Sequence, residues 1–352
     1  MLIIKQIKIM NVYLLSRMKV SLFGICGLLL ISTYGCKKSD SLKAGQQSAD
    51  QHTGSPKTQG LVESSDFTVM DNNADLVYAG NIISGKLLTD SAKFWGLNDY
   101  QKLPIRISCS FPGQNTGDVI NTPRMSSFRQ TLQNILRRQT FQNTQIGAFA
   151  YTYRPFYDYD ELRKEFGYNL SVRGLFSSSS TSLMHNVTTI KKRFGFVASF
   201  EIENFTVDVP LPKKTELVSE TDLAALVATG EDPLYINSIS YGQKGILSVE
   251  TNLDMEETNK AFTKVTKKIF KKTTETMTEY EKNLIQQSTI TLFLVGGPNS
   301  GSPITIDGYN SFITYVTSLG DFSADNPGYP TSFRLRRLKD YSLFKLNVNL
   351  PN

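Results

Sequence analysis

Residue types that commonly carry out catalysis are sparse in this chain. The two histidines, His52 and His185, lie in a polar stretch and a serine-rich run, whereas a Ser-His-Asp triad or a zinc site needs histidine among ordered partners. Neither HExxH nor GxSxG occurs, and the glycine-rich run at 296–301 lacks the lysine of a phosphate-binding loop. Glu201 and Glu203 stand two apart, as glycosidase carboxylates could, but this spacing is typical of a solvated strand face. We expect no catalytic residue, no cofactor and a protein that is not an enzyme.

Closely spaced carboxylates at Asp158, Asp160 and Glu161 raise the question of calcium. An EF-hand loop needs a glycine at its sixth position and a glutamate at its twelfth. Counted from Asp158, those positions hold Arg163 and Asn169. A solvated turn therefore fits this segment better than a metal site, and we expect no bound metal.

The first 35 residues have the composition of an export signal. Lys19 precedes a short apolar run at 21–32, which is shorter than a membrane-spanning helix requires. Gly35 then precedes Cys36, as at the cleavage site of a bacterial lipoprotein, in which Cys36 would carry the lipid. We expect 1–35 to be a lipoprotein signal peptide, and the protein to be exported to the outer membrane or cell surface or released. Plain secretion without a lipid is the alternative.

The charge of the chain gives no argument for a nucleic-acid partner. The formal net charge is +6, but four of the basic residues and no acidic residue lie in the signal segment. Without that segment, 34 basic residues face 32 acidic ones. Nucleic-acid binding usually requires a clustered basic face, so we expect no nucleic acid among the partners.

Composition divides the remaining chain into a tether and a folded core. Residues 36–68 are mostly polar and bury too little surface to offset chain entropy, which predicts a flexible tether. Residues 69–352 are long enough for about two domain cores. Cys109 is the single thiol after Cys36, so an internal disulfide is not expected. Its place in an alternating apolar run at 105–111 predicts a small buried hydrophobe.

Hydrophobic periodicity predicts strands and helices along the core. Alternation over Leu103–Phe111 indicates a strand, and a helix is expected to open at Asn121 with Pro123 in its first turn. Helical spacing then runs through about 256–285, followed by a strand at 288–295. A period-two pattern with one strongly apolar face consists of Phe194, Phe196, Ala198, Phe200 and Ile202. Taken alone, this pattern fits an ordinary half-buried strand.

Three motifs resemble the thiol-activated, or cholesterol-dependent, cytolysins. The run Leu234–Thr251, with Tyr241-Gly242 at its centre, is similar to the core strand pair of that family. Gly296-Gly297 follows the strand at 288–295, and Asn326-Pro-Gly-Tyr-Pro330 is similar to a passage near the end of the family's fold, before a long strand expected at Phe333–Asn347. The resemblance implies an α+β, MACPF-like fold. It would be elongated, with a twisted, mainly antiparallel central sheet flanked by two helical clusters.

The resemblance also implies a mechanism without a catalytic group. Within a core at 69–352, a convertible region at about 165–320 would be joined to an elongated strand region at about 69–110 and 330–352. The segments 171–203 and 256–286 would become membrane β-hairpins, the first with the apolar face that begins at Phe194. Gly296 and Gly297 would form a hinge that frees a sheet edge for self-association. The expected partners are a lipid membrane and either identical copies or a related, longer cytolysin.

Two features depart from the family pattern. The family's C-terminal β-sandwich, with its cysteine- and tryptophan-rich passage and its cholesterol-reading Thr-Leu pair, has no counterpart up to Asn352, and the single tryptophan is Trp95. We therefore expect a short form lacking the C-terminal cholesterol-binding domain. The run 264–272 would put lysine on both faces of a strand, which is costly at a bilayer centre. The leading hypothesis is a pore-forming lipoprotein, acting either alone or as one part of a two-part pore. The alternative is a non-lytic, lipid-anchored surface protein that reuses the fold for binding or self-assembly.

Overall fold

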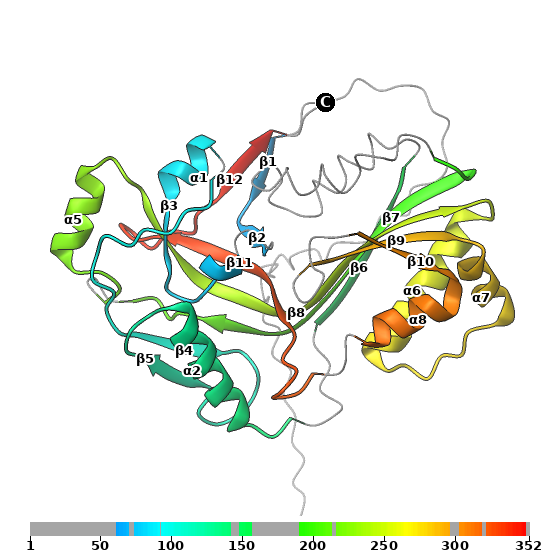
Figure 1. Cartoon of the computed structure of the whole chain (residues 1–352), viewed down its shortest axis with the longest axis horizontal. Coiled ribbons are helices and arrows are strands. Elements are labelled where there is room, and N and C mark those ends of the chain that lie inside the picture. Colours follow the sequence, from blue (N-terminus) through cyan, green and yellow to red (C-terminus); the bar gives the residue numbers. More distant parts are fainter. Residues whose placement is uncertain are drawn as a thin grey trace, which may run out of the picture. The chain divides into compact units, whose positions relative to one another are not determined.

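A computed structural model describes residues 61–69, 74–91, 93–141, 148–156, 190–212, 216–295, 303–318 and 322–349. These residues form an α+β fold around a ten-stranded sheet in which every pairing is antiparallel (Figure 1). Its strands are β2 (Asp66–Thr68), β3 (Ile82–Ser84), β4 (Ile105–Cys109), β5 (Gly117–Ile120), β6 (Ala148–Phe156), β7 (Phe194–Asp208), β8 (Pro233–Thr251), β9 (Thr289–Val295), β10 (Pro303–Asp307) and β11 (Tyr329–Arg337). Strands β1 (Leu61–Ser64) and β12 (Leu346–Asn349) form a separate pair.

Helices lie at both ends of the two longest strands, β7 and β8 (Figure 1). They are α1 (Gly85–Ser91), α2 (Met125–Arg137), α5 (Glu220–Ala228), α6 (Met255–Lys271), α7 (Glu279–Gln286) and α8 (Gly308–Ser318), with a short 3-10 turn, η1, at Ala74–Leu76. Helices α6, α7 and α8 cluster on one half of the sheet. No helix in the described part of the chain is long and apolar enough to cross a membrane.

Two hydrophobic cores form along β7 and β8. The first contains the N-terminal half of β8, together with β4, β11 and α2. The second lies between the other half of β7–β9 and the cluster of α6–α8. Strand β8 can serve both cores because its residues alternate, so that Ile246 points into the first core while Leu247 points into the second. Burial on both faces explains its nearly continuous apolar sequence.

Three boundaries differ from the sequence predictions. The run Leu234–Thr251 is one continuous strand, β8, because Gly242 serves a close backbone approach and not a turn. Helix α2 begins only at Met125, since the Ser127 hydroxyl accepts the Arg124 N–H at 3.1 Å and makes Arg124 the capping residue. The strand predicted at Phe333–Asn347 is interrupted.

The interruption follows the end of β11 at Arg337 and continues to the start of β12 at Leu346. Tyr341 adopts a positive φ of 59° within this turn. The predicted tether at 36–68 also ends earlier than expected. Strands β1 and β2 already lie at 61–68, because Phe67 is apolar enough to be buried against Phe333 at a ring distance of 5.6 Å.

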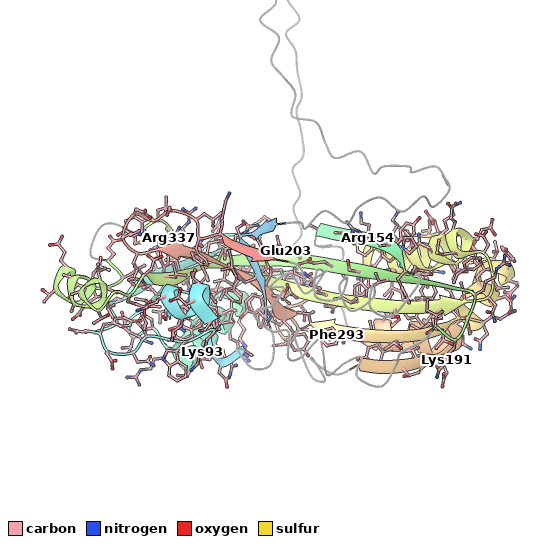
Figure 2. All side chains as sticks on the ribbon, turned by 90° about the horizontal axis from the view of Figure 1, so that it is seen from above. Lys93, Arg154, Lys191, Glu203, Phe293 and Arg337 are labelled. Carbon is pink, nitrogen blue, oxygen red and sulfur yellow. The ribbon has the colours of Figure 1, made fainter. Side chains whose placement is uncertain are left out.

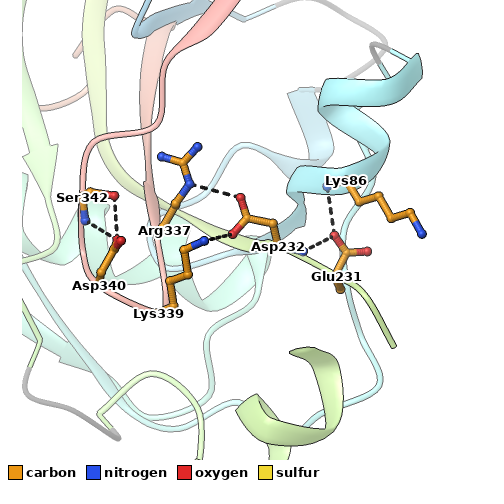
Figure 3. A network of polar contacts seen from close by, with 7 residues as sticks. All are labelled: Lys86, Glu231, Asp232, Arg337, Lys339, Asp340 and Ser342. Atoms are coloured by element: carbon orange, nitrogen blue, oxygen red, sulfur yellow. Dashed lines mark hydrogen bonds and ion pairs between the residues drawn. The ribbon is translucent and has the colours of Figure 1, made fainter. Parts of the chain in front are cut away.

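A polar network holds the start of β8 against the end of β11 and the start of α1 (Figure 3). The Asp232 carboxylate accepts the Arg337 Nε–H at 3.1 Å and lies 3.5 Å from the Lys339 ammonium. The neighbouring Glu231 carboxylate accepts the Lys86 backbone N–H at 3.0 Å and the Ser84 hydroxyl at 2.8 Å. Two adjacent carboxylates thus fasten three elements at one corner of the sheet.

Removing the Asp232 charge is expected to lower stability modestly. Asp232→Asn weakens both cationic contacts in a partly exposed network, so we expect a loss of about 1 kcal/mol in the free energy of unfolding. The matched control is Asp75→Asn, because the Asp75 side chain is 96% exposed and lies 3.9 Å from Arg129. Urea unfolding followed by circular dichroism measures both. Equal changes in the two variants would contradict a structural role for the network.

Candidate convertible sheet and helix cluster

Helix α6 begins directly after β8 and folds back over the sheet that it has just left. The Asp254 carboxylate caps it by accepting the Glu257 N–H at 2.8 Å, which is a common way for a helix to start. Its apolar positions repeat every three to four residues, so Ala261, Phe262 and Val265 are buried on one face. The structure confirms the helical spacing that the sequence shows in this segment.

The apolar face of β7 is the surface that α6 covers. Phe196 and Phe200 are 0% exposed, Ala198 and Ile202 are also buried, and Phe194 is half-buried. The Phe196 ring lies 5.9 Å from the Phe262 ring, edge to face. The residues expected to form a membrane-facing stripe are therefore neighbours in one strand, and in this structure a helix shields most of them from water.

Strands β6 and β7 hold both halves of α6 through aromatic contacts and a hydrogen bond. Phe270 stacks on Phe200 with the ring centres 5.2 Å apart and lies 6.2 Å from the Phe149 ring. The Lys271 ammonium stands 5.5 Å above the Phe149 ring, a cation–π contact. The Tyr151 hydroxyl donates to the Asn259 side-chain oxygen at 3.2 Å. These contacts fasten the helix to the edge of the sheet.

An ion pair joins α6 to α7. The Lys264 ammonium donates to both oxygens of Glu281, at 2.8 and 2.9 Å. Glu281 also accepts the Thr278 backbone N–H at 2.7 Å while Thr278 caps α7 in return, which is a capping box. The hydrogen bond from Lys264 is the main cause that lowers the pKa of Glu281 below its ordinary value of 4.5.

Because its folded-state pKa is lowered, Glu281 stabilises the fold above its unfolded pKa, and this contribution disappears as the pH falls through the lowered value. We expect Glu281→Gln to be less stable than the parent at neutral pH. The difference should shrink as the pH falls below about 4.5. Melting temperatures of both proteins across this range measure the effect. A difference that stays constant with pH would contradict the proposed linkage.

Strand β10 and helix α8 cover the other edge of this sheet region. Strand β10 pairs with β9 along five residues, from Pro303–Phe293 to Asp307–Thr289. Phe312 of α8 packs edge to face on Phe262 at 5.3 Å. Figure 2 shows Arg154 of β6 and Phe293 of β9 on opposite sides of β7 and β8. In the strand order β6-β7-β8-β9-β10, β10 is the outermost strand and covers the edge of β9.

Gly242 marks the place where β8 changes neighbours on one edge. Before it, β8 pairs with β11 as far as Tyr329–Gly242; after it, β8 pairs with β9 from Lys244–Val295 onward. The sheet is irregular here, since β7 has a bulge between Glu203 and Phe205. A β-carbon at Gly242 would lie 1.7 Å from the Ile202 carbonyl oxygen, so glycine is required for the close approach of the two backbones.

The remaining predicted sites separate into two groups. Cys36, Gly296 and Gly297 lie outside the described residues, as do both histidines and the carboxylates that begin at Asp158. Glu201 is paired with Lys244 at 3.3 Å, and Glu203 accepts the Ser240 hydroxyl at 2.7 Å. Among the described residues, no group of three or more His, Cys, Asp or Glu side chains could hold a metal.

Cys109 is buried as predicted. Its thiol belongs to the first core, and burial raises its pKa to about 12. A thiol with so high a pKa is a poor nucleophile at neutral pH.

Helices α6 and α7 are thus inserted between two adjacent antiparallel strands, β8 and β9. The family model described as thiol-activated cytolysin matches residues 40–349. Tetanolysin of Clostridium tetani is 23% identical over 294 residues, which cover 80% of this chain and 54% of tetanolysin. Pneumolysin of Streptococcus pneumoniae is 23% identical over 291 residues, covering 78% of this chain and 60% of pneumolysin.

Solved structures show the same fold. A pneumolysin structure superposes with a TM-score of 0.63 at 20% identity and covers 83% of this chain and 63% of pneumolysin. Listeriolysin O superposes with a TM-score of 0.61 at 20% identity, covering 82% and 61%. The protein belongs to the thiol-activated cytolysin family. It spans between about half and two thirds of the length of these relatives.

Proposed function

We propose that the protein is a pore-forming lipoprotein, anchored through Cys36, that self-associates and converts two segments into membrane hairpins. One observation carries this proposal most directly. Helices α6 and α7 connect Thr251, at the end of β8, to Thr289, at the start of β9, and these two strands are already hydrogen-bonded neighbours. If the helices became extended, they would lengthen an existing strand pair without any change of strand order.

The first segment has the same connectivity. Strands β6 and β7 are also antiparallel neighbours, paired from Ala148–Glu203 to Phe156–Gly195. The chain between them contains most of the predicted segment 171–203, whose residues 171–189 lie outside the described part. Extension of both segments would place four adjacent strands in one membrane-directed sheet. Phe196, Ala198 and Phe200 would then exchange the shelter of α6 for another apolar environment.

Self-association would use the edge of β9. Strand β10 satisfies the hydrogen-bonding groups of that edge in this structure, and an uncovered strand edge is a template for pairing with another chain. A hinge at Gly296 and Gly297 between the two strands would let β10 move away, because glycine tolerates unusual backbone angles. The new neighbour would be a second copy or a related, longer cytolysin in a two-part pore. Cholesterol is not required in this scheme, because the lipid anchor holds the protein at the bilayer.

Dye release from vesicles tests the proposed function. The chain from Lys37 onward would be attached by an N-terminal histidine tag to phosphatidylcholine vesicles containing a nickel-chelating lipid, with and without cholesterol. We expect leakage in both, and its loss in the Gly296→Val/Gly297→Val variant. The control is Gly96→Ala, which lies outside the hinge and whose β-carbon would meet the flexible Leu76 side chain at 3.3 Å. Absence of leakage by the parent chain, alone and with a longer cytolysin, would contradict the proposal.

The alternative function is a non-lytic surface protein that binds or self-assembles through the same fold. The lysine-rich part of α6 favours it, since Lys267, Lys268 and Lys271 are poor candidates for contact with lipid tails. Aspartate at Phe196 and Phe200 does not separate the two functions, because both rings are fully buried and a charge there would unfold the protein. A covalent link that holds α6 on the sheet does separate them.

A further inference from the structure

The strand pair β8–β9 fixes a register that can be continued into the helices. The seven pairs run without a shift from Lys244–Val295 to Glu250–Thr289, so the two residue numbers of each pair always add to 539. We infer that α6 and α7 convert in this same register, to a hairpin whose tip is Ile269-Phe270 and in which the ion-pair partner of Lys264 changes from Glu281 to Glu275. This inference rests on the proposed function and specifies its geometry.

The continued register places the lysine run at the end of the hairpin. Lys268 would face Lys271 and Lys267 would face Lys272, on either side of the tip. The midpoint of the inserted chain thus coincides with the four lysines that a membrane-crossing strand could least accommodate. At the tip, they would lie in the far headgroup region, where a lysine costs about 0–1 kcal/mol and not the 2–4 kcal/mol of the bilayer centre.

The same register separates charged from uncharged residues over the strands next to the tip. A transmembrane strand needs about 9–11 residues, which corresponds to 259–268 and 271–280. On one face, every side chain between the tip lysines and the near end is uncharged: Asn259, Ala261, Thr263 and Val265 opposite Tyr280, Thr278, Thr276 and Thr274. Tyr280 would lie at the near interface, where aromatic residues are common.

The other face carries complementary charges directly across from each other. Lys260 would face Glu279, and Lys264 would face Glu275. A register displaced by two residues would set Lys264 opposite Thr273 and lose that pairing. Opposite charges on facing strand residues stabilise a sheet, and a polar face suits the lumen of a membrane barrel. The lysines of α6 are therefore compatible with insertion, because each either faces a glutamate on the opposite strand or lies beside the tip.

The residue that faces Glu281 differs between the helical structure and the inferred hairpin. In this structure Glu281 contacts Lys264 at 2.8 Å, whereas in the hairpin Glu281 would face Thr258. Those two positions on α6 are six residues apart, or about 9 Å along a helix. Directly opposed strand residues have Cα atoms about 4.5–5.5 Å apart, within the range that a disulfide spans, and pairs displaced by two residues do not.

Cysteine pairs therefore test the register. In a Cys109→Ala background of the tagged chain from Lys37, we would compare Thr258→Cys/Glu281→Cys, Lys264→Cys/Glu275→Cys and the displaced control Lys264→Cys/Thr273→Cys. Each is oxidised in solution and on leaking vesicles diluted with unlabelled parent chain. Intramolecular disulfides are read on denaturing gels. We expect the first two pairs to oxidise at least about fivefold faster on vesicles than in solution, and the control not to.

The outcomes distinguish a wrong register from a wrong proposed function. Leakage with oxidation of the control pair, or with neither of the first two pairs faster on vesicles, would overturn the register while leaving the pore intact. No leakage by the parent chain would overturn the proposed function itself and, with it, the inference. Leakage with both in-register pairs trapped supports the tip at Ile269-Phe270.

Discussion

Linking α6 to β6 by a reversible crosslink is expected to abolish leakage completely. Tyr151 and Asn259 are joined by a side-chain hydrogen bond across the two elements. Cysteines at both positions can be bridged by a bifunctional methanethiosulfonate reagent. The bridged helix cannot leave the sheet, so the second hairpin cannot form, although the fold and its exposed surfaces stay as they are.

Reductant provides the internal control for that experiment. Cleavage of the bridge should restore leakage to the level of the double-cysteine variant before crosslinking. The single variants Tyr151→Cys and Asn259→Cys, treated with the same reagent, should leak throughout. If the bridged protein leaks as fast as the parent, α6 does not have to leave the sheet. If it is inactive in leakage while still assembling on vesicles, association precedes conversion.

A single methyl group at Gly242 should have the largest effect on stability. Its β-carbon would lie 1.7 Å from the Ile202 carbonyl oxygen and 2.8 Å from the carbonyl carbon, so the backbones of β7 and β8 would have to separate. On the other side, Gly328 just before β11 packs closely on Gly242, since a β-carbon built on Gly328 would lie only 2.7 Å from the Gly242 carbonyl oxygen. We expect Gly242→Ala to cost at least about 3 kcal/mol.

Gly96→Ala is the matched control for this prediction. Gly96 also lies beside a strand, at an isolated bridge with Ile83. A β-carbon there would meet the Leu76 methyl group at 3.3 Å, which a side chain can accommodate by a small shift. Chemical unfolding of both variants measures the free energy of unfolding that each substitution costs. A Gly242→Ala protein that is as stable as the Gly96→Ala protein would show that the two strands are not as tightly apposed as the structure has them.

Period-two and helical patterns predict the interior of this fold well. The alternation from Phe194 onward and the apolar spacing around Phe262 both appear as predicted, because each residue's burial depends mainly on its own element. The position of Cys109 follows for the same reason. These patterns do not predict which element packs on a buried face, since nothing in the sequence of β7 indicates that α6 covers it.

Features that depend on contacts between distant segments were not predictable. The sequence places Gly242 at the centre of the expected strand pair, but its role comes from the close approach of the Ile202 backbone in another strand. The ion pair of Lys264 with Glu281 joins two helices that are separate segments of the sequence. The register of β8 and β9 likewise requires the paired strands, and it changes the interpretation of the lysine run from an obstacle to a hairpin tip.

The central claim, that α6 becomes a strand when the protein leaks vesicles, can be measured as a distance. Spin labels at the exposed positions Glu256 and Lys271 are separated by 15 residues, which corresponds to about 22 Å in a helix. In the hairpin Lys271 lies opposite Lys268, twelve residues along the strand from Glu256, which corresponds to about 40 Å. Pulsed electron spin resonance on labelled chains diluted in unlabelled parent reads that distance. We predict about 22 Å in solution and about 40 Å on leaking vesicles. A distance that remains near 22 Å while the vesicles empty would contradict the account.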